Sequence, residues 1–235
     1  MISRVALCCL LLATTRLQAV DTSPTEKELA VIKDELMKLG EFIGPWNNSG
    51  EGTVNGKKSA WKETLEWSWK FAKSGMPSIV LKVKDGKFFE EATINYSIEA
   101  KGYTASVKNA KGTADTYTGN LDKRGYLVLE RTDDASKDVH KLKFGTAAAG
   151  IRLNVAYDVQ AGGKGLASTL YKSNGNKEGE SLAGSTKKNE CIVTGGAATI
   201  QVSYSGKTYY VCCSGCADAF KEEPEKFIKA AAAKK

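Results

Sequence analysis

Residues 79–98 read IVLKVKDGKFFEEATINYSI, and this stretch decides the fold. Two runs rich in β-branched and aromatic residues flank a turn at residues 84–87 (KDGK). Such runs favour β-strands, and an Asp-Gly pair between them is typical of a hairpin. The stretch therefore predicts two antiparallel strands joined by a tight turn.

The same pattern continues in both directions along the chain. A loose alternation of polar and apolar residues precedes it, and further strand-like runs follow at intervals of about 8–12 residues. The later runs are Tyr103–Lys108, Ala114–Asn120, Tyr126–Arg131, Val139–Phe144, Ile151–Val159 and Leu166–Tyr171. Turn residues bound each run, and no helical interval separates them. Nine or ten short strands of this kind predict a mainly β fold, an antiparallel sandwich or an up-and-down barrel.

An amphipathic helix is predicted before the strands. Ser23 can cap it, Pro24 suits its first turn and Glu26 can complete a capping box. Apolar residues then recur at helical spacing until Gly40, a natural stop: Leu29, Ile32, Leu36 and Leu39. We expect this helix to pack against the sheet.

Residues 39–46 (LGEFIGPW), followed by residues 49–52 (SGEG), resemble the entrance of lipocalin-type barrels and their nitrobindin-like relatives. The resemblance implies an antiparallel lipocalin-like β-barrel with an interior cavity for a small apolar ligand. It carries no haem site, because the one histidine, His140, lies in a charged stretch and is expected at the surface. Large aromatic residues either line such a cavity or, as we favour, fill the core: Trp46, Trp61, Trp67, Trp69, Phe71, Phe88 and Phe89.

Residues 1–19 have the pattern of a signal peptide. Arg4 precedes an apolar run at residues 5–13, which is too short to span a bilayer, and Ala19 suits the cleavage site. We expect a soluble exported protein, periplasmic or secreted, with no membrane partner after cleavage. Cleavage also removes Arg4 and Arg16, which lowers the net charge from +7 to +5. The remaining lysines are scattered, so no nucleic-acid partner is expected.

The sequence offers no catalytic constellation in the β region. Residues 20–173 contain no cysteine, one histidine and no Gly-x-Ser-x-Gly motif, so a nucleophile with its base is missing. Paired acids such as Glu90-Glu91 are adjacent, and adjacent side chains on a strand point to opposite faces. We therefore expect a protein that is not an enzyme. Residues 174–189, rich in Gly, Ser and Lys, are predicted to link residues 20–173 to a C-terminal module at 190–235.

Every cysteine beyond the signal segment lies in that module. Cys191 is followed by a predicted hairpin, 199–204 and 208–211 with a Ser-Gly turn, and then by Cys212, Cys213 and Cys216. Helices are predicted from Ala217 and from Pro224, so Cys212 should end a strand and Cys216 should lie in a first helical turn. Zinc ribbons and treble clefs use this placement, and a helix start favours the thiolate that a metal needs.

Residues 190–230 resemble the TRASH and YHS family of small metal-binding domains. The resemblance rests on CIVTG at 191–195, YSGKTYYVCCSGC at 204–216, Phe220 and EPEKF at 223–227. It implies thiolate ligands at Cys191, Cys212 and Cys216, with copper or zinc as the metal and a role in metal transport, buffering or sensing. Many members have a second cysteine where this chain has Thr194.

The departure at Thr194 leaves the coordination number open. Three thiolates suit Cu(I), or they leave a position for water, for Cys213 or for a ligand from a partner. Two other hypotheses remain. The four cysteines of the module can form disulfides in an oxidising compartment, with Cys191 joined to Cys212 or Cys216. Alternatively, the barrel carries a small molecule and the module is a structural cap.

Overall fold

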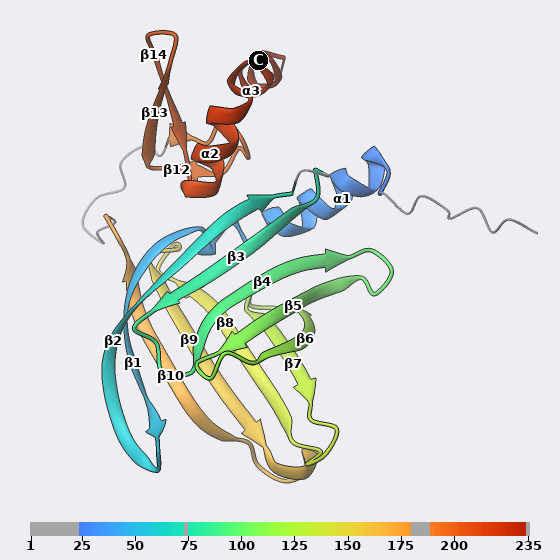
Figure 1. Ribbon diagram of the computed structural model, residues 1–235, viewed down its shortest axis with the longest axis vertical. Helices are drawn as coiled ribbons and strands as arrows, with labels where there is room; N and C mark the ends of the chain where they lie inside the picture. Colours follow the sequence, from blue (N-terminus) through green and yellow to red (C-terminus); the bar gives the residue numbers. More distant parts are fainter. Residues whose placement is uncertain (1–23, 73–74, 180–188, 234–235) are drawn as a thin grey trace, which may run out of the picture.

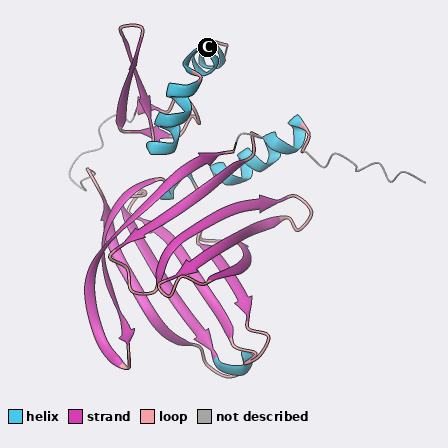
Figure 2. Ribbon diagram, in the orientation of Figure 1, coloured by secondary structure: helices cyan, strands magenta, loops and turns pink. Residues whose placement is uncertain are grey.

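The computed structural model describes residues 24–72, 75–179 and 189–233. A helix leads into a barrel of ten strands, and a small α+β module follows (Figures 1 and 2). The mainly β class predicted from the sequence is confirmed. The predicted signal segment, residues 1–19, and most of the predicted linker, residues 180–188, lie outside the described residues.

The N-terminal helix α1 (Glu26–Met37) has its N-cap two residues later than predicted. Thr25, not Ser23, is the N-cap: its Oγ1 accepts a hydrogen bond from the Glu28 amide, and the Glu28 carboxylate accepts one from the Thr25 amide. Both Ser-x-x-Glu and Thr-x-x-Glu fit a capping box, and the structure forms the second. The helix ends before Gly40, which instead begins a short 3-10 turn, η1 (Gly40–Phe42). None of the helices in the described ranges is long and apolar enough to cross a membrane.

The barrel is an antiparallel meander closed by pairing of its first and last strands. In order around the barrel the strands are β1 (Gly44–Val54), β10 (Ser168–Lys177), β9 (Arg152–Gln160), β8 (Val139–Ala147), β7 (Leu127–Thr132), β6 (Ala114–Leu121), β5 (Gly102–Asn109), β4 (Phe89–Ser97), β3 (Pro77–Lys84) and β2 (Lys57–Phe71). Closure leaves no exposed sheet edge. The last strand runs to Lys177, four residues into the segment predicted as linker.

The barrel core is continuous with α1. Ile32 and Leu36 are buried, and the Tyr103 hydroxyl donates to the Glu35 carbonyl at 2.9 Å, which fixes the helix on the barrel. Trp46 and Trp67 are fully buried, so these tryptophans fill the core as predicted. The helix therefore covers the barrel end that also faces the C-terminal module (Figure 1).

The other half of the barrel interior holds a buried carboxylate among aromatic rings. Glu63 is 4% exposed and accepts hydrogen bonds from Trp61 Nε1 at 2.7 Å and from the hydroxyls of Tyr171 and Ser173. Phe88 packs on Trp61 and Tyr171 with ring centroids 6.0 and 5.1 Å away. Three donors to one carboxylate offset the cost of burying its charge.

His140 is half-buried rather than exposed. Its Nδ1 lies 2.7 Å from the Tyr157 hydroxyl, and the two rings stack with centroids 5.9 Å apart. Burial, followed by the nearby Arg131 guanidinium, lowers the pKa of this imidazole. The expectation of a surface histidine is therefore corrected, since its ring packs on an inward-facing tyrosine.

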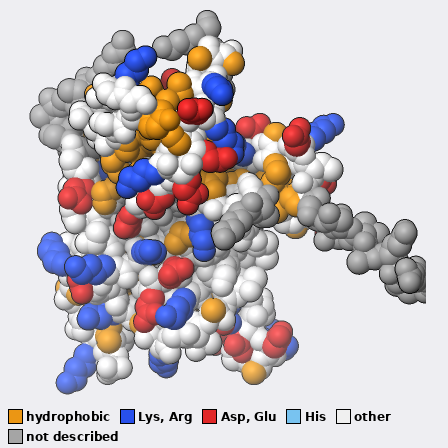
Figure 3. All heavy atoms as spheres, turned by 45° about the horizontal axis from the view of Figure 1, so that its top comes forward, with side chains coloured by type: hydrophobic (Ala, Val, Ile, Leu, Met, Phe, Trp, Pro, Cys, Tyr) orange, Lys and Arg blue, Asp and Glu red, His pale blue; other side chains and the backbone are white. Residues whose placement is uncertain are grey.

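Residues 189–233, the described part of the C-terminal module, contain four short strands and two helices. They are β11 (Asn189–Glu190), β12 (Ala197–Ala198), β13 (Ile200–Tyr204), β14 (Lys207–Val211), α2 (Ser214–Glu222) and α3 (Pro224–Ala232). Hydrophobic side chains gather on the module and beside α1, whereas charges of both signs are scattered over the barrel wall (Figure 3).

Candidate metal centre

The first cysteine lies on a turn between β11 and β12. The Cys191 amide donates to the Gly196 carbonyl, and the Gly195 amide donates to the Cys191 carbonyl, both at 2.7 Å. Gly195 has φ of +82°, a conformation that glycine adopts without strain. The turn directs the Cys191 thiol toward the rest of the module.

The hairpin β13–β14 delivers the second cysteine. Ser205 and Gly206 both have positive φ, which matches the right-handed twist of a two-residue hairpin. Cys212 follows directly after β14, and the Ile192 amide donates to the Tyr210 carbonyl at 3.0 Å. This bond ties the Cys191 turn to the strand that leads into Cys212.

Helix α2 supplies the third cysteine. Cys216 lies in its first turn, as the sequence predicted, and Cys213 is its N-cap, because the helix begins at Ser214, three residues before the predicted start at Ala217. Phe220, one turn later, is 2% exposed and packs on Tyr209 with ring centroids 5.3 Å apart. The helix is thereby anchored with its N-terminus at the thiols.

These three elements bring Cys191, Cys212 and Cys216 together. Their sulfurs all lie within 4.8 Å of one another, with 3.5 Å between Cys212 and Cys216, and the residues are 2%, 7% and 0% exposed. Thiolates around one zinc ion, with bonds of about 2.3 Å, are separated by a little under 4 Å. All four cysteines of the described ranges are free. The triad fits a soft or borderline metal because its donors are all sulfur.

The three thiols are linked to one another by hydrogen bonds. Hydrogen bonds from Cys212 and Cys216 lower the pKa of Cys191. The same contacts raise the pKa values of Cys212 and Cys216, because each keeps its proton to donate. A metal ion that replaces these protons would therefore take over their role of holding the sulfurs together.

The YHS domain family matches residues 193–231. This region is a YHS domain. Cys212 and Cys216 lie inside the matched range, and Cys191 lies two residues before it. The resemblance stated from the sequence is confirmed at family level for this region. No match to the whole chain was found among curated proteins.

Cys213 belongs to the YHS domain but lies outside the triad. Its Sγ is 4.0 Å from that of Cys212 and accepts a hydrogen bond from the Trp69 amide, on barrel strand β2, at 3.3 Å. Hydrogen bonds from Cys212 and Cys216 and the amide of Trp69 lower its pKa. The fourth predicted site residue is thus directed toward the barrel.

The barrel contacts the YHS domain at the start of α2. Ser214 Oγ donates to Glu66 Oε1 at 3.1 Å. A side chain at Gly215 would overlap the Trp69 carbonyl oxygen. The sequence analysis missed these barrel residues, because the Trp69 contacts use backbone atoms. Gly215, just before the helix predicted from Ala217, was the one available signal.

Thr194 is buried beside the cysteine triad. It is 7% exposed, and its Oγ1 lies 3.6 Å from Cys212 Sγ. A pocket of about 250 Å³ between barrel and domain is lined by Thr194 and Cys212 on one side and by Met37 on the other. The side of the triad marked by Thr194 therefore faces this pocket.

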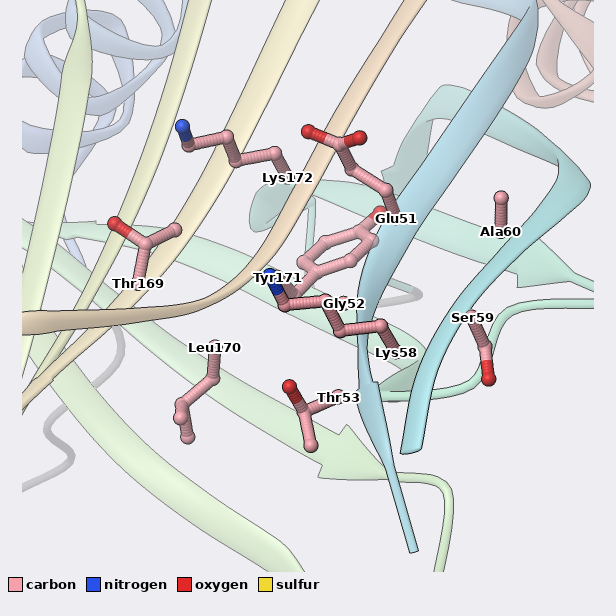
Figure 4. A pocket seen from close by; sticks show the side chains of 10 residues that line it. All are labelled: Glu51, Gly52, Thr53, Lys58, Ser59, Ala60, Thr169, Leu170, Tyr171 and Lys172. Atoms are coloured by element: carbon pink, nitrogen blue, oxygen red, sulfur yellow. The ribbon is translucent and has the colours of Figure 1, made fainter. Parts of the chain in front are cut away.

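Another pocket, of about 470 Å³, lies at the barrel wall away from the thiols. It is formed by β1, β2 and β10, where the pairing of β10 with β9 shifts between Thr169 and Tyr171 (Figure 4). Glu51, Lys58 and Lys172 carry charges of both signs around it. None of the four described cysteines lines it, so it is separate from the candidate metal centre.

Proposed function

We propose that this chain is an exported, non-catalytic protein that binds a soft or borderline metal ion through Cys191, Cys212 and Cys216. The carrying observation is the cluster of three buried sulfurs, all within 4.8 Å, supplied by a turn, a strand end and a helix start. Such a cluster is costly unless its charge is neutralised, and a metal ion supplies that neutralisation.

Copper and zinc fit the donors best. Cu(I) accepts three soft thiolates, and Zn(II) accepts three thiolates plus one further ligand. Neither ion requires a fourth ligand from the protein, because water or an external molecule can complete the zinc site. Thr194 occupies the position where a fourth protein ligand would be expected. An exchangeable site of this kind suits transport, buffering or sensing of the metal rather than a purely structural role.

Export rests on the sequence of residues 1–19 and makes oxidation the main competitor of metal binding. Burial of the triad supports ligation, because oxidants reach buried thiols slowly.

The decisive experiment is anaerobic competition of the reduced full-length protein against chromophoric chelators, with Zn(II) and Cu(I) in turn. We expect one equivalent of one of these metals to bind tightly to the wild type. Cys191→Ser, Cys212→Ser and Cys216→Ser should each weaken binding by at least about a hundredfold. Failure of both metals to compete would refute the proposal.

A second candidate function is a small-molecule carrier. A pocket of about 400 Å³ at the barrel end remote from α1 is lined by Phe88, Phe89, Tyr117 and Tyr157 and also by the charged Lys87, Lys111, Asp115 and Arg131, which favours a small ligand with an apolar body and a polar group. Native mass spectrometry of protein purified without denaturation tests this function. A co-purified small molecule that a Phe88→Ala substitution displaces would support it, and an unliganded barrel would contradict it.

A further inference from the structure

The pocket between the barrel and the YHS domain reaches one face of the cysteine triad. Its lining includes Cys212 and Thr194 but neither Cys191 nor Cys216. The wall on the barrel side includes Trp69 and Met37, the last residue of α1. A molecule in the pocket would thus approach the triad beside Cys212.

The side of the triad at the pocket lacks a protein ligand. Thr194 Oγ1 is 3.6 Å from Cys212 Sγ, and a neutral hydroxyl is a poor ligand for a soft metal ion. The sulfur of Cys213 is held by the Trp69 amide at 3.3 Å and does not line the pocket. The barrel thus keeps Cys213 at the interface while the position next to Thr194 stays accessible.

We propose that this pocket is a binding site for a small external thiol, which completes the coordination of the metal as its fourth ligand. The inference rests on the proposed function, because it requires metal at the triad. A thiol binds by losing its proton to solvent, and its thiolate forms one new bond to the metal. No bond between the metal and the protein has to break.

The walls of the pocket select the ligand by size and softness. A volume of about 250 Å³ suits a molecule such as cysteine and is small for a tripeptide thiol. The Met37 thioether and the Trp69 side chain offer an apolar, polarisable wall for a sulfur. Glu41 and Lys177 place opposite charges in the lining, which suits a zwitterionic tail.

Two glycines line the pocket, one on the barrel wall and one on the wall of the YHS domain, and a larger side chain at either position would reduce the volume of the pocket. No atom lies within 4 Å of a side chain built at Gly40, on the barrel wall. A side chain at Gly196, on the wall of the YHS domain, would meet Thr194 Oγ1 at an ordinary 3.7 Å. Neither glycine has a positive φ, so larger residues fit without backbone strain.

The experiment uses the full-length protein, reduced, anaerobic and loaded with one equivalent of Co(II). Loading itself should produce sulfur-to-cobalt charge-transfer absorption, and its absence would refute the proposed function before any thiol is added. Addition of cysteine should then give a saturable change in the d–d bands. Glutathione should bind at least about tenfold more weakly.

Substitutions locate the added thiol. Gly40→Phe and Gly196→Leu should load cobalt normally but bind cysteine at least about tenfold more weakly, whereas Gly40→Ala and Gly196→Ala should match the wild type. A loaded wild type that does not respond to cysteine would overturn the inference, as would filled-pocket variants that respond unchanged. A response in Cys213→Ser but not in the wild type would show that Cys213 occupies the fourth position, and would also overturn it.

Discussion

Leu127, Leu129 and Leu142 are fully buried in the barrel, whereas the fully buried residues of the YHS domain include Cys216 and Val211. The barrel has ten closed strands around an aromatic and aliphatic core. The C-terminal module has strands of two to five residues, and four of its buried side chains are thiols. A small core rich in thiols needs a further source of stability, and a metal ion supplies one. The comparison predicts that metal removal destabilises the YHS domain but not the barrel. It also predicts that a core substitution in the barrel destabilises the barrel but not the YHS domain.

Metal removal should have the largest effect, and it should be confined to the YHS domain. Structural zinc contributes about 10–16 kcal/mol to the folding of small zinc domains. A chelator should therefore abolish amide-exchange protection in α2 and β14 while β7 and β8 remain protected. Hydrogen exchange with mass spectrometry measures both regions at once. Unchanged protection in α2 after complete metal removal would contradict the dependence on metal.

A cavity in the barrel should give the reverse pattern. Leu129 is 0% exposed, so Leu129→Ala should lower the free energy of unfolding of the barrel by about 2–5 kcal/mol. Leu166, 97% exposed, provides a matched control, and Leu166→Ala should change it little. Urea unfolding gives the stability, and chelator competition should give an unchanged metal affinity. A parallel loss of metal affinity would mean that the two regions unfold as one unit.

A single substitution can disrupt the contact between the barrel and the YHS domain. Gly215→Ala should separate α2 from β2 at a cost of about 1–3 kcal/mol, because the new methyl overlaps the Trp69 carbonyl oxygen. Alanine otherwise favours helices, so a destabilising effect cannot come from propensity. Exchange of the Trp69 amide, which donates to Cys213, reports on the contact directly. Gly196→Ala is the control, and equal Trp69 protection in both variants would refute the contact.

Much of the barrel could be predicted from sequence because strands alternate with period two and turns carry glycine. The helix start was wrong by two residues, since Ser23 and Thr25 each precede a glutamate at capping-box spacing. The end of β10 was also missed, because the polar residues 174–177 pair with β1 and β9 while lacking apolar alternation. Long-range pairing, rather than local propensity, extends that strand.

The candidate site, like the barrel, could be predicted only in part from the sequence. Spacing and resemblance predicted Cys191, Cys212 and Cys216, because a hairpin and a helix start fix their positions locally. The contact of Cys213 with the barrel could not be predicted, since it depends on a backbone amide of Trp69 some 144 residues away in the chain. Contacts made by backbone atoms leave no pattern in a single sequence.

The smallest effect expected is a pH dependence of barrel stability through His140. Burial lowers its pKa below the ordinary 6.5, so the unfolded chain takes up a proton more readily than the folded barrel. Its contribution to stability is present above that ordinary value and is lost as the pH falls toward the folded pKa. Urea midpoints of the wild type and His140→Gln at about pH 7.5 and about pH 5.5 measure it. An equal acid-induced decrease in both proteins would contradict the assignment.

The measurement that tests the central claim most directly is X-ray absorption at the metal edge of the loaded, full-length protein, together with a count of free thiols. We predict one bound Zn or Cu ion whose first shell contains three protein sulfurs at about 2.3 Å. The Cys213→Ser variant should keep the same three sulfurs. A metal-free protein with its thiols joined in disulfides, or a bound metal with no sulfur neighbours, would contradict the account.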